Sequence, residues 1–214
     1  MSSAVRLLCM RHGQSTDNVH NISSSRPPGA GLSDLGMRQA REALQSIGDQ
    51  PVTAIYSSTA RRAEETGTVL AESLGTTLIG RRELLEYDVG EFEGSAAPTA
   101  MRHSHAMLRR WVVDADLEAR LPGGESGREV VDRFSSVIAE IALSHAGETV
   151  VVVGHVGTLT IGLLNLCDGL PVSSVWGRPL PHAVPVQVEY DGKAWTCSAW
   201  PEASDMAPRS VPAL

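Results

Sequence analysis

Short hydrophobic runs alternate along this chain with longer stretches of helical periodicity. The runs predict strands at residues 5–10, 52–56, 77–79, 150–153, 184–190 and 195–200. Four consecutive valines, Val150 to Val153, are typical of a strand buried on both faces of a sheet. The dipeptide Asp191-Gly192 is a strong signal for a tight turn, so the last two strands should form a hairpin.

The stretches of helical periodicity fall between these strands. They predict helices from about Asp34 to Ile47, from Ser57-Ser58 to Leu74, around Met101 to Val112, from Ser126 or a neighbour to Ser144, and from the turn at 154–157 to near Leu166. Ser33 is a suitable N-cap for the first of them. Residues 80–124 form the least regular part. Because strands alternate with helices, we expect a three-layer α/β/α sandwich with a mostly parallel central sheet.

Composition sets the scale of the fold. A chain of 214 residues with 42% hydrophobic residues can bury the core of one α/β domain, which we place at residues 1–200. No repeat or low-complexity block divides it. Residues 201–214 are rich in Pro, Ala and Ser and are expected to be a flexible tail.

Charge and cysteine content exclude several classes of protein. The net charge of −7 and the lack of a long basic run argue against a nucleic-acid partner. Cys9, Cys167 and Cys197 are widely spaced, as expected of reduced thiols rather than a disulfide frame or zinc site. No run approaches the ~20 apolar residues that cross a bilayer. We expect a soluble cytoplasmic protein with no membrane partner.

Two histidines occur where hydrophobic strands stop, in Arg11-His12-Gly13 and in Gly154-His155-Val156-Gly157. Either histidine alone could simply hydrogen-bond a loop carbonyl. The carboxyl ends of neighbouring parallel strands converge on one crevice, so the pair together indicates a ligand site. A guanidinium beside an imidazole there could hold and attack a phosphate.

A third polar segment, residues 57–66, places Arg62 in the first turn of a helix after another strand. A helix N-terminus with a guanidinium favours phosphate binding, although an exposed Arg61-Arg62 pair bridged to Glu65 is the alternative. Five carboxylates then lie close together, and most of them should face water: Glu83, Glu86, Asp88, Glu91 and Glu93. Residue patterns alone do not choose among them.

The chain resembles the histidine phosphatase superfamily, also called the phosphoglycerate mutase-like family, from Leu7 to about Tyr190. The resemblance rests on residues 10–15 with Asn18, 32–36 with Gln39-Ala40, Ser57-Ser58 with Arg62-Ala63 and Thr66, 84–86 with Gly90 and Glu93-Gly94, 122–126, and 153–157. Six ordered segments are a specific signal, and the resemblance implies a phosphoglycerate mutase-like fold.

The resemblance also implies roles for individual residues. His12 would form a phosphohistidine, and Arg11, Arg62 and His155 would hold the three equatorial oxygens. Asn18 and Val156 would add further phosphate contacts. Glu86 would protonate the leaving alkoxide and later take a proton from water, which requires a partly buried carboxyl with a raised pKa. Positioning and charge stabilisation would suffice for this transfer, so no metal or cofactor is expected.

Three functions remain open: a phosphatase for a small phosphomonoester, a cofactor-dependent phosphoglycerate mutase, and a non-catalytic phospholigand-binding protein. Residues 95–121 look too short for the lid by which such mutases exclude water, and Asp17 replaces a tryptophan frequent in mutases. Both observations favour hydrolysis. The presence of His12 and Glu86 argues against a binding protein.

Substrate identity is not readable from the sequence. Residues 20–31 and 95–121 should form the rim that contacts the leaving group, and four arginines could reach an acidic substituent: Arg26, Arg102, Arg109 and Arg110. His20 and His182 could border the pocket. His103 and His105 lie two apart on a helix, which disfavours a metal site. A homodimer through the terminal hairpin remains open.

Overall fold

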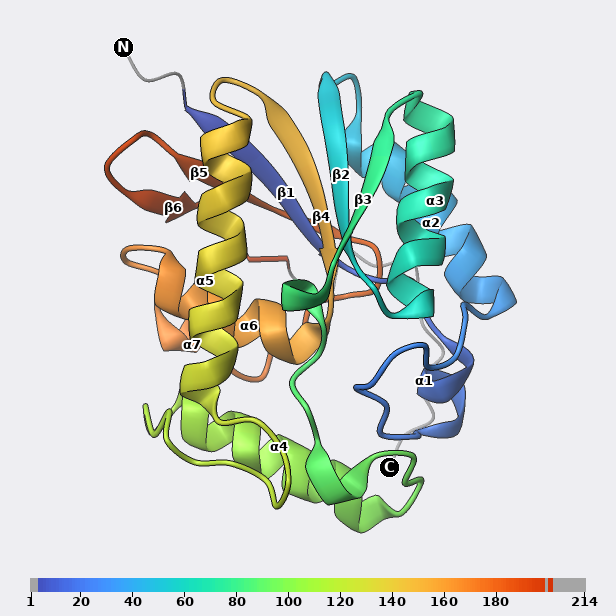
Figure 1. The fold of residues 1–214 in the computed structure, drawn as a ribbon, viewed down its shortest axis with the longest axis vertical. Coiled ribbons are helices and arrows are strands. Elements are labelled where there is room, and N and C mark those ends of the chain that lie inside the picture. Colours follow the sequence, from blue (N-terminus) through green and yellow to red (C-terminus); the bar gives the residue numbers. More distant parts are fainter. Residues whose placement is uncertain (1–3, 199, 202–214) are drawn as a thin grey trace.

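The computed structural model describes residues 4–198 and 200–201, and its centre is a six-stranded sheet (Figure 1). The strands are β1 Val5–Arg11, β2 Val52–Ser58, β3 Thr77–Arg81, β4 Thr149–Gly154, β5 Pro185–Tyr190 and β6 Trp195–Cys197. Their order across the sheet is β3-β2-β4-β1-β5-β6. The first four strands of that order pair in parallel, and β5 and β6 join antiparallel. The predicted mostly parallel sheet is confirmed.

Helices connect the strands. They are α1 Thr16–His20, α2 Asp34–Ile47, α3 Arg61–Leu74, α4 Pro98–Val112, α5 Gly127–Ser144, α6 Val156–Leu166 and α7 Val172–Val175, with 3-10 turns η1 Arg82–Leu84 and η2 Gly90–Phe92. Ser33 caps α2 as predicted, by accepting a hydrogen bond from the Gly36 amide. Ser126 and Glu129 form a reciprocal capping box that begins α5.

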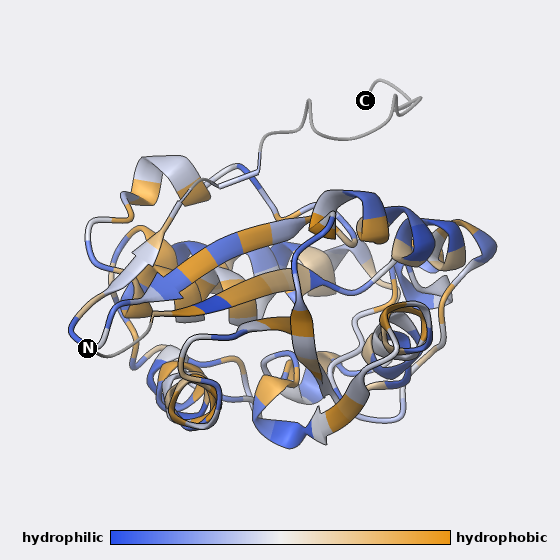
Figure 2. Cartoon of the chain, turned by 90° about the horizontal axis from the view of Figure 1, so that it is seen from above, coloured by the Kyte–Doolittle hydropathy of each residue, from blue (hydrophilic) through white to orange (hydrophobic). Residues whose placement is uncertain are grey.

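The sheet lies between two helical layers because alternate residues of each strand point to opposite faces. In β1, Leu7 and Cys9 pack in the core cluster that contains buried residues of α5 and α6. Leu8 and Met10 pack in the opposite cluster, with residues of α2 and α3. Figure 2 shows hydrophobic residues along the strands, with helices on either side. The three-layer α/β/α sandwich is therefore confirmed.

A third hydrophobic cluster anchors the segment that the sequence marks as least regular. Trp111 of α4 packs edge-on against Tyr87, with ring centroids 5.0 Å apart, and both belong to a cluster with Val130 of α5 and Ile161 of α6. The Trp111 indole donates a 2.7 Å hydrogen bond to the Ala119 carbonyl. These contacts hold the segment from Tyr87 to Leu121 against α5 and α6.

The structure corrects several predicted boundaries. Ser57 and Ser58 do not open a helix: they extend β2, pairing with β3, and α3 begins only at Arg61. The strand predicted at 77–79 runs on to Arg81. The short helices α1 and α7 escape prediction because one turn of helix has no hydrophobic period to detect. Of the predicted tail, residues 202–214 lie outside the described residues.

Three neighbouring parallel strands end at one edge of the sheet. Arg11, the last residue of β1, is in register with Gly154, the last residue of β4, and Ser57 of β2 is in register with Val153. The residues that follow these strands therefore meet at the same edge, as the sequence predicted. Within the described residues, no helix is long and apolar enough to cross a membrane.

Candidate active site

The centre of the candidate site is a buried arginine between two buried histidines. Arg62 Nε donates to His12 Nε2 at 3.1 Å, and Arg62 Nη2 contacts His155 Nδ1 at 3.1 Å. The two imidazole rings lie edge to face, with centroids 5.1 Å apart. All three side chains are nearly inaccessible to solvent. His12 follows β1, Arg62 lies in the first turn of α3 after β2, and His155 follows β4 as the N-cap of α6.

The hydrogen bonds assign one tautomer to each histidine. In His12 the nitrogen Nε2 accepts from Arg62, so the proton lies on Nδ1, which donates to the Gly13 carbonyl at 2.6 Å. In His155 the nitrogen Nδ1 faces Arg62, so Nε2 donates to Ser58 Oγ at 2.7 Å. Each ring therefore presents an unprotonated nitrogen to the guanidinium.

Burial and positive neighbours keep both imidazoles neutral. Desolvation lowers the pKa of His12 well below its usual value, and the charges of His155, Arg11 and Arg62 lower it further. The pKa of His155 is lowered mainly by desolvation and then by Arg62 and Arg11. Desolvation also lowers the pKa of Arg62, against the opposing charges of Glu86, Asp17 and Glu93. A neutral His12 keeps the electron pair that a nucleophile needs.

One donor at this centre has no hydrogen-bond acceptor. Arg62 Nη1 is buried and has no partner among the described residues, while Nη2 also donates to the Ser24 carbonyl at 2.9 Å. A buried guanidinium donor without an acceptor is unusual and calls for an explanation. An anion bound at this guanidinium would supply an acceptor and offset the local positive charge.

Glu86 lies against the N-terminus of α6, directly beside His155. Its carboxylate accepts from the amides of Gly157 at 2.9 Å and Thr158 at 2.8 Å. The Thr158 hydroxyl, which donates to the Leu85 carbonyl at 2.8 Å, lies 3.2 Å from the same carboxylate. The helix N-terminus thus selects this carboxylate from the five that the sequence offers.

The other four carboxylates do not behave alike. Asp88 pairs with Arg26, Glu93 accepts from Ser25 Oγ at 2.6 Å, and Glu83 pairs with Arg81. Glu91 is exposed. The side chains of Glu83 and Asp88 are still 42% and 34% exposed, so three of these four face water as expected, although arginines also reach Glu83 and Asp88.

The remaining predicted site residues lie around this centre. Arg11 ends β1 and donates a long 3.5 Å hydrogen bond to the Leu180 carbonyl. Asn18 lies on α1, where its side-chain oxygen accepts from the Ser15 amide, which leaves its NH₂ group as the donor. Val156 is the first residue of α6, so its amide lies at the helix N-terminus beside His155.

The sequence suggests His20 and His182 as neighbours of the pocket, and the structure places only His182 beside this centre. His182 is buried, with its ring centroid 5.7 Å from that of His12 and its Nδ1 2.9 Å from the His12 carbonyl oxygen. His20 is exposed on α1, by contrast. Ser58 was assigned to a helix, yet it orients His155 from the end of β2. The signal that could have identified Ser58 is its position as a polar residue at the end of a hydrophobic strand.

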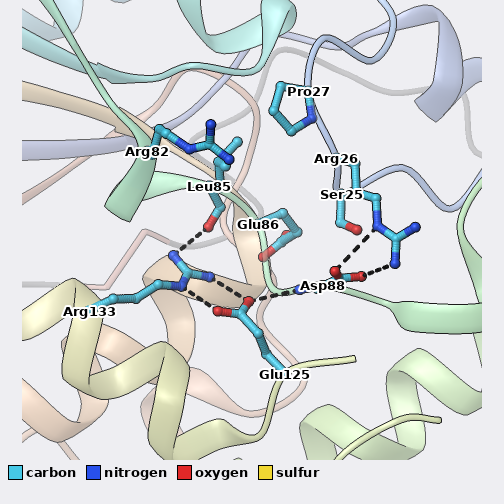
Figure 3. A pocket seen from close by; sticks show the side chains of 9 residues that line it. All are labelled: Ser25, Arg26, Pro27, Arg82, Leu85, Glu86, Asp88, Glu125 and Arg133. Atoms are coloured by element: carbon cyan, nitrogen blue, oxygen red, sulfur yellow. Dashed lines mark hydrogen bonds and ion pairs between the residues drawn. The ribbon is translucent and has the colours of Figure 1, made fainter. Parts of the chain in front are cut away.

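A cavity of about 630 Å³ opens beside Glu86 (Figure 3). It is lined by Ser25, Arg26, Pro27, Arg82, Leu85, Glu86, Asp88, Glu125 and Arg133. Of the arginines proposed for the rim, Arg26 lines this cavity, whereas Arg109 and Arg110 form ion pairs with Asp114 and Asp116. Among the described residues, no group of three or more His, Cys, Asp or Glu could hold a metal ion.

Comparisons with known proteins agree with this geometry. Residues 7–203 match the family model of the histidine phosphatase superfamily, branch 1. A protein of Hydrogenobacter thermophilus, provisionally named phosphoserine phosphatase 2, is 29% identical over 191 residues, covering 89% of this chain and 92% of that protein. A protein of Yersinia pestis, provisionally named phosphoglycerate mutase GpmB, is 26% identical and spans 98% of this chain and 97% of its own length.

A solved structure is similar over the same range. The mycobacterial glucosyl-3-phosphoglycerate phosphatase, determined with VO3, has a TM-score of 0.75 and 27% identity, covering 92% of this chain and 99% of that one. The enzyme class expected from the sequence, a phosphoric monoester hydrolase, is confirmed by the family match and by relatives named phosphatases. The chain belongs to the histidine phosphatase superfamily, branch 1.

Proposed function

We propose that this protein is a metal-independent phosphatase that hydrolyses a small phosphomonoester through a phosphohistidine on His12 Nε2. One observation carries the proposal: buried Arg62 bridges two unprotonated imidazole nitrogens while its Nη1 has no acceptor among the described residues. A phosphoryl group between the rings would meet a nucleophile on one side and guanidinium donors around its oxygens.

Binding places the phosphorus atom before His12. Arg11 and Arg62 hold two equatorial oxygens and His155 holds the third, which requires that His155 Nδ1 take up a proton when the anion binds. The Asn18 NH₂ group and the Val156 amide add neutral donors. The amide contributes the partial positive charge of the α6 N-terminus. Phosphoryl transfer needs mainly positioning and charge stabilisation, which these donors supply.

The reaction has two transfers. His12 Nε2 attacks phosphorus, the bond from phosphorus to the alcohol oxygen breaks, and Glu86 gives that oxygen its proton. Water then attacks the phosphohistidine, Glu86 takes the water's proton, and the nitrogen–phosphorus bond breaks to release phosphate. The 2.6 Å hydrogen bond from Nδ1 to the Gly13 carbonyl stabilises the imidazolium of the intermediate.

The relatives' names support hydrolysis without choosing a substrate. Two of those described above are named phosphatases, for phosphoserine and for glucosyl-3-phosphoglycerate, and one is named a phosphoglycerate mutase. Mutase activity is the alternative, and it requires that water be kept from the phosphohistidine. The cavity beside Glu86 favours access of water to that intermediate.

The test is phosphate release from a panel of phosphomonoesters in EDTA, with His12→Ala and a control, His103→Ala, alongside. His103 is exposed on α4, outside the histidine pair. We expect hydrolysis by the wild type and by the control, and a loss of about 1,000-fold or more in kcat for His12→Ala. Alkaline quench followed by mass spectrometry should locate the phosphoryl group on His12.

Three results would overturn the proposal. Hydrolysis that survives in His12→Ala would exclude His12 as the nucleophile. Interconversion of phosphoglycerates without phosphate release would establish the mutase, and tight phospholigand binding with no turnover of any substrate would establish a binding protein.

A further inference from the structure

The cavity beside Glu86 lies where the leaving group of the proposed reaction must sit. Glu86 is on its wall, and it is the group that would protonate the leaving oxygen. Figure 3 shows Arg82 and Leu85 on one side of Glu86, with Ser25, Arg26 and Pro27 across from them. Any alcohol bonded to a phosphoryl group on His12 would extend into this space.

Most of the charge that lines this cavity is already paired. Arg26 forms an ion pair with Asp88 at 3.2 Å, and Arg133 forms one with Glu125 at 2.8 Å. Glu86 is held by the amides of α6. Among the described residues, this leaves Arg82 as the lining guanidinium without an ion-pair or hydrogen-bond partner for its side chain.

The backbone at Arg82 is fixed although its side chain is exposed. Arg82 begins the 3-10 turn η1, and its carbonyl accepts from the Leu85 amide at 3.0 Å. Leu84 of the same turn is fully buried in the core. The turn therefore holds the base of the arginine a short way along the chain from Glu86, while the guanidinium remains able to reach a ligand.

We propose that Arg82 binds a carboxylate on the leaving group, so that the preferred substrates are phosphomonoesters of hydroxy acids. This inference rests on the proposed function and narrows its substrate class. A planar guanidinium matches a carboxylate with two parallel hydrogen bonds. A second phosphate group would fit this cavity less well than a carboxylate. It carries up to two negative charges, whereas Arg82 is the one unpaired guanidinium among the described lining residues, and Asp88 and Glu125 add negative charge to the same lining.

The test compares matched substrates that differ in the carboxylate. O-phosphoserine is paired with O-phosphoethanolamine, and 3-phosphoglycerate with glycerol 3-phosphate. We expect the wild type to prefer the acid of at least one pair by about tenfold or more in kcat/KM. In Arg82→Gln that preference should fall to about twofold or less, while kcat/KM for the partner without carboxylate stays within about twofold of the wild type.

Two further variants test whether the preference depends on the planar guanidinium of Arg82 or merely on losing an exposed arginine. Arg82→Lys keeps the positive charge but loses the bidentate fork, so it should recover only part of the preference. Arg41→Gln removes an exposed arginine on α2, outside the cavity lining, and should leave every ratio unchanged. Thermal unfolding of each variant checks that the fold is intact.

The outcomes distinguish failure of this inference from failure of the proposed function. Equal hydrolysis of both members of each pair by an enzyme that depends on His12 would overturn the role of Arg82 alone. A preference for the acids that survives in Arg82→Gln would do the same. If bisphosphates tested in the same assay are preferred over both acids, the group that Arg82 binds is a second phosphate and not a carboxylate, and the inference is overturned. Absence of hydrolysis, or hydrolysis independent of His12, would overturn both proposals.

Discussion

At the scale of single residues, the guanidinium of Arg62 and the two imidazoles beside it control one another's protonation. Each histidine turns an unprotonated nitrogen toward Arg62, and burial keeps both rings neutral. The burial that keeps the proposed nucleophile His12 neutral has a cost for folding, since two titratable groups and a cation have left water. An anionic substrate would offset that cost, so phosphate should stabilise the protein.

The lowered pKa values of His12 and His155 make stability depend on pH. In the unfolded chain each imidazole titrates near its usual pKa of about 6.5, whereas in the folded protein it takes up a proton only at lower pH. The unfolded state therefore binds more protons below about pH 6.5, so stability is lost as pH falls through that value. The slope should be up to about 1.4 kcal/mol per pH unit for each imidazole.

Urea unfolding at several pH values between about 5 and 8 measures this slope. The double variant His12→Gln, His155→Gln removes both titrations and should show a flatter dependence in the same range. His20→Gln, an exposed histidine on α1, is the matched control and should keep the wild-type slope. Equal slopes in the wild type and the double variant would contradict a buried neutral pair.

At the scale of elements, hydrophobic period and capping residues account for most of the fold. The bounds of α2 follow from Ser33 and from apolar positions at helical spacing, and the end of α5 at Ser144 is as predicted. The prediction fails at Ser57-Ser58, where two polar residues finish a buried strand. Ser58 contacts His155, which lies 97 residues later in the chain, so the local hydrophobic pattern contains no information about this hydrogen bond.

Some residues of the candidate site can likewise be predicted from local sequence, and others cannot. His12, Arg62 and His155 are predictable because each follows a hydrophobic strand, and Glu86 is singled out only by the family resemblance. Arg82 lies outside these signals, and the sequence suggests His182 as a neighbour of the pocket without indicating which group it contacts. Their importance depends on the cavity and on the backbone of His12, which exist only after distant segments have packed together.

The junction of β4 and α6 tolerates no side chain at Gly157. A Cβ atom there would lie 2.3 Å from Tyr87 Cε1 and 2.8 Å from Glu86 Oε1. We expect Gly157→Ala to cost about 1–3 kcal/mol of stability and to lower kcat by displacing the Glu86 carboxylate.

Chemical denaturation and steady-state kinetics measure the two effects in the same variant. Gly80→Ala is the matched control, because a Cβ at Gly80 would meet its nearest atom, Thr59 Cγ2, at an ordinary 3.4 Å. A Gly157→Ala protein with wild-type stability and turnover would show that Tyr87 and Glu86 can move freely, against the packing described here.

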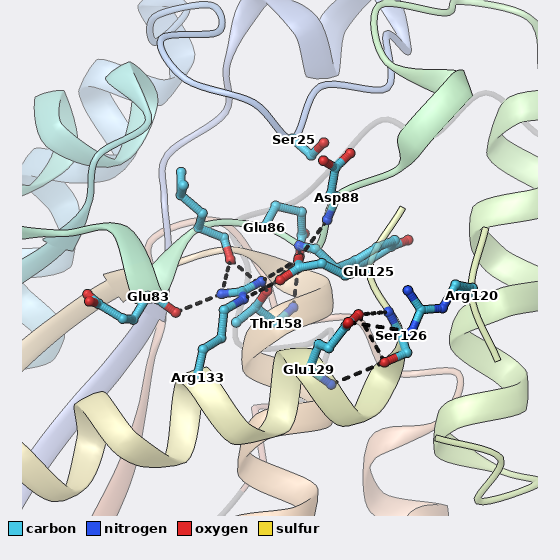
Figure 4. A network of polar contacts seen from close by, with 12 residues as sticks. Ser25, Glu83, Glu86, Asp88, Arg120, Glu125, Ser126, Glu129, Arg133 and Thr158 are labelled. Atoms are coloured by element: carbon cyan, nitrogen blue, oxygen red, sulfur yellow. Dashed lines mark hydrogen bonds and ion pairs between the residues drawn. The ribbon is translucent and has the colours of Figure 1, made fainter. Parts of the chain in front are cut away.

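At the scale of the whole molecule, Arg133 of α5 ties the proposed acid to the body of the protein (Figure 4). Its guanidinium donates to the carbonyls of Glu83 and Leu85 at 2.7 and 2.9 Å, and it forms an ion pair with Glu125. Thr158 of α6 lies at the edge of the same network. One side chain thus connects two helices with the segment that carries Glu86.

Removing this connection should loosen the segment around Glu86. In Arg133→Met we expect faster hydrogen exchange for amides of residues 83–94, a loss of about 2 kcal/mol in stability, and lower kcat. The control is Arg128→Met on the same helix, where a 3.6 Å surface pair with Glu118 should contribute little. Unchanged exchange at 83–94 in Arg133→Met would mean that the third hydrophobic cluster alone holds the segment.

The strand order has a consequence for how the molecule is made. β1, which carries Arg11 and leads into His12, pairs with β4 and β5, both encoded more than a hundred residues later. A ribosome therefore exposes the segment of the proposed nucleophile long before its sheet partners. β1 lacks both neighbours until β4 has emerged, and it lacks β5 until residues up to Tyr190 have emerged. Catalytic competence should arise abruptly, with the last strands, and no amino-terminal fragment should show it.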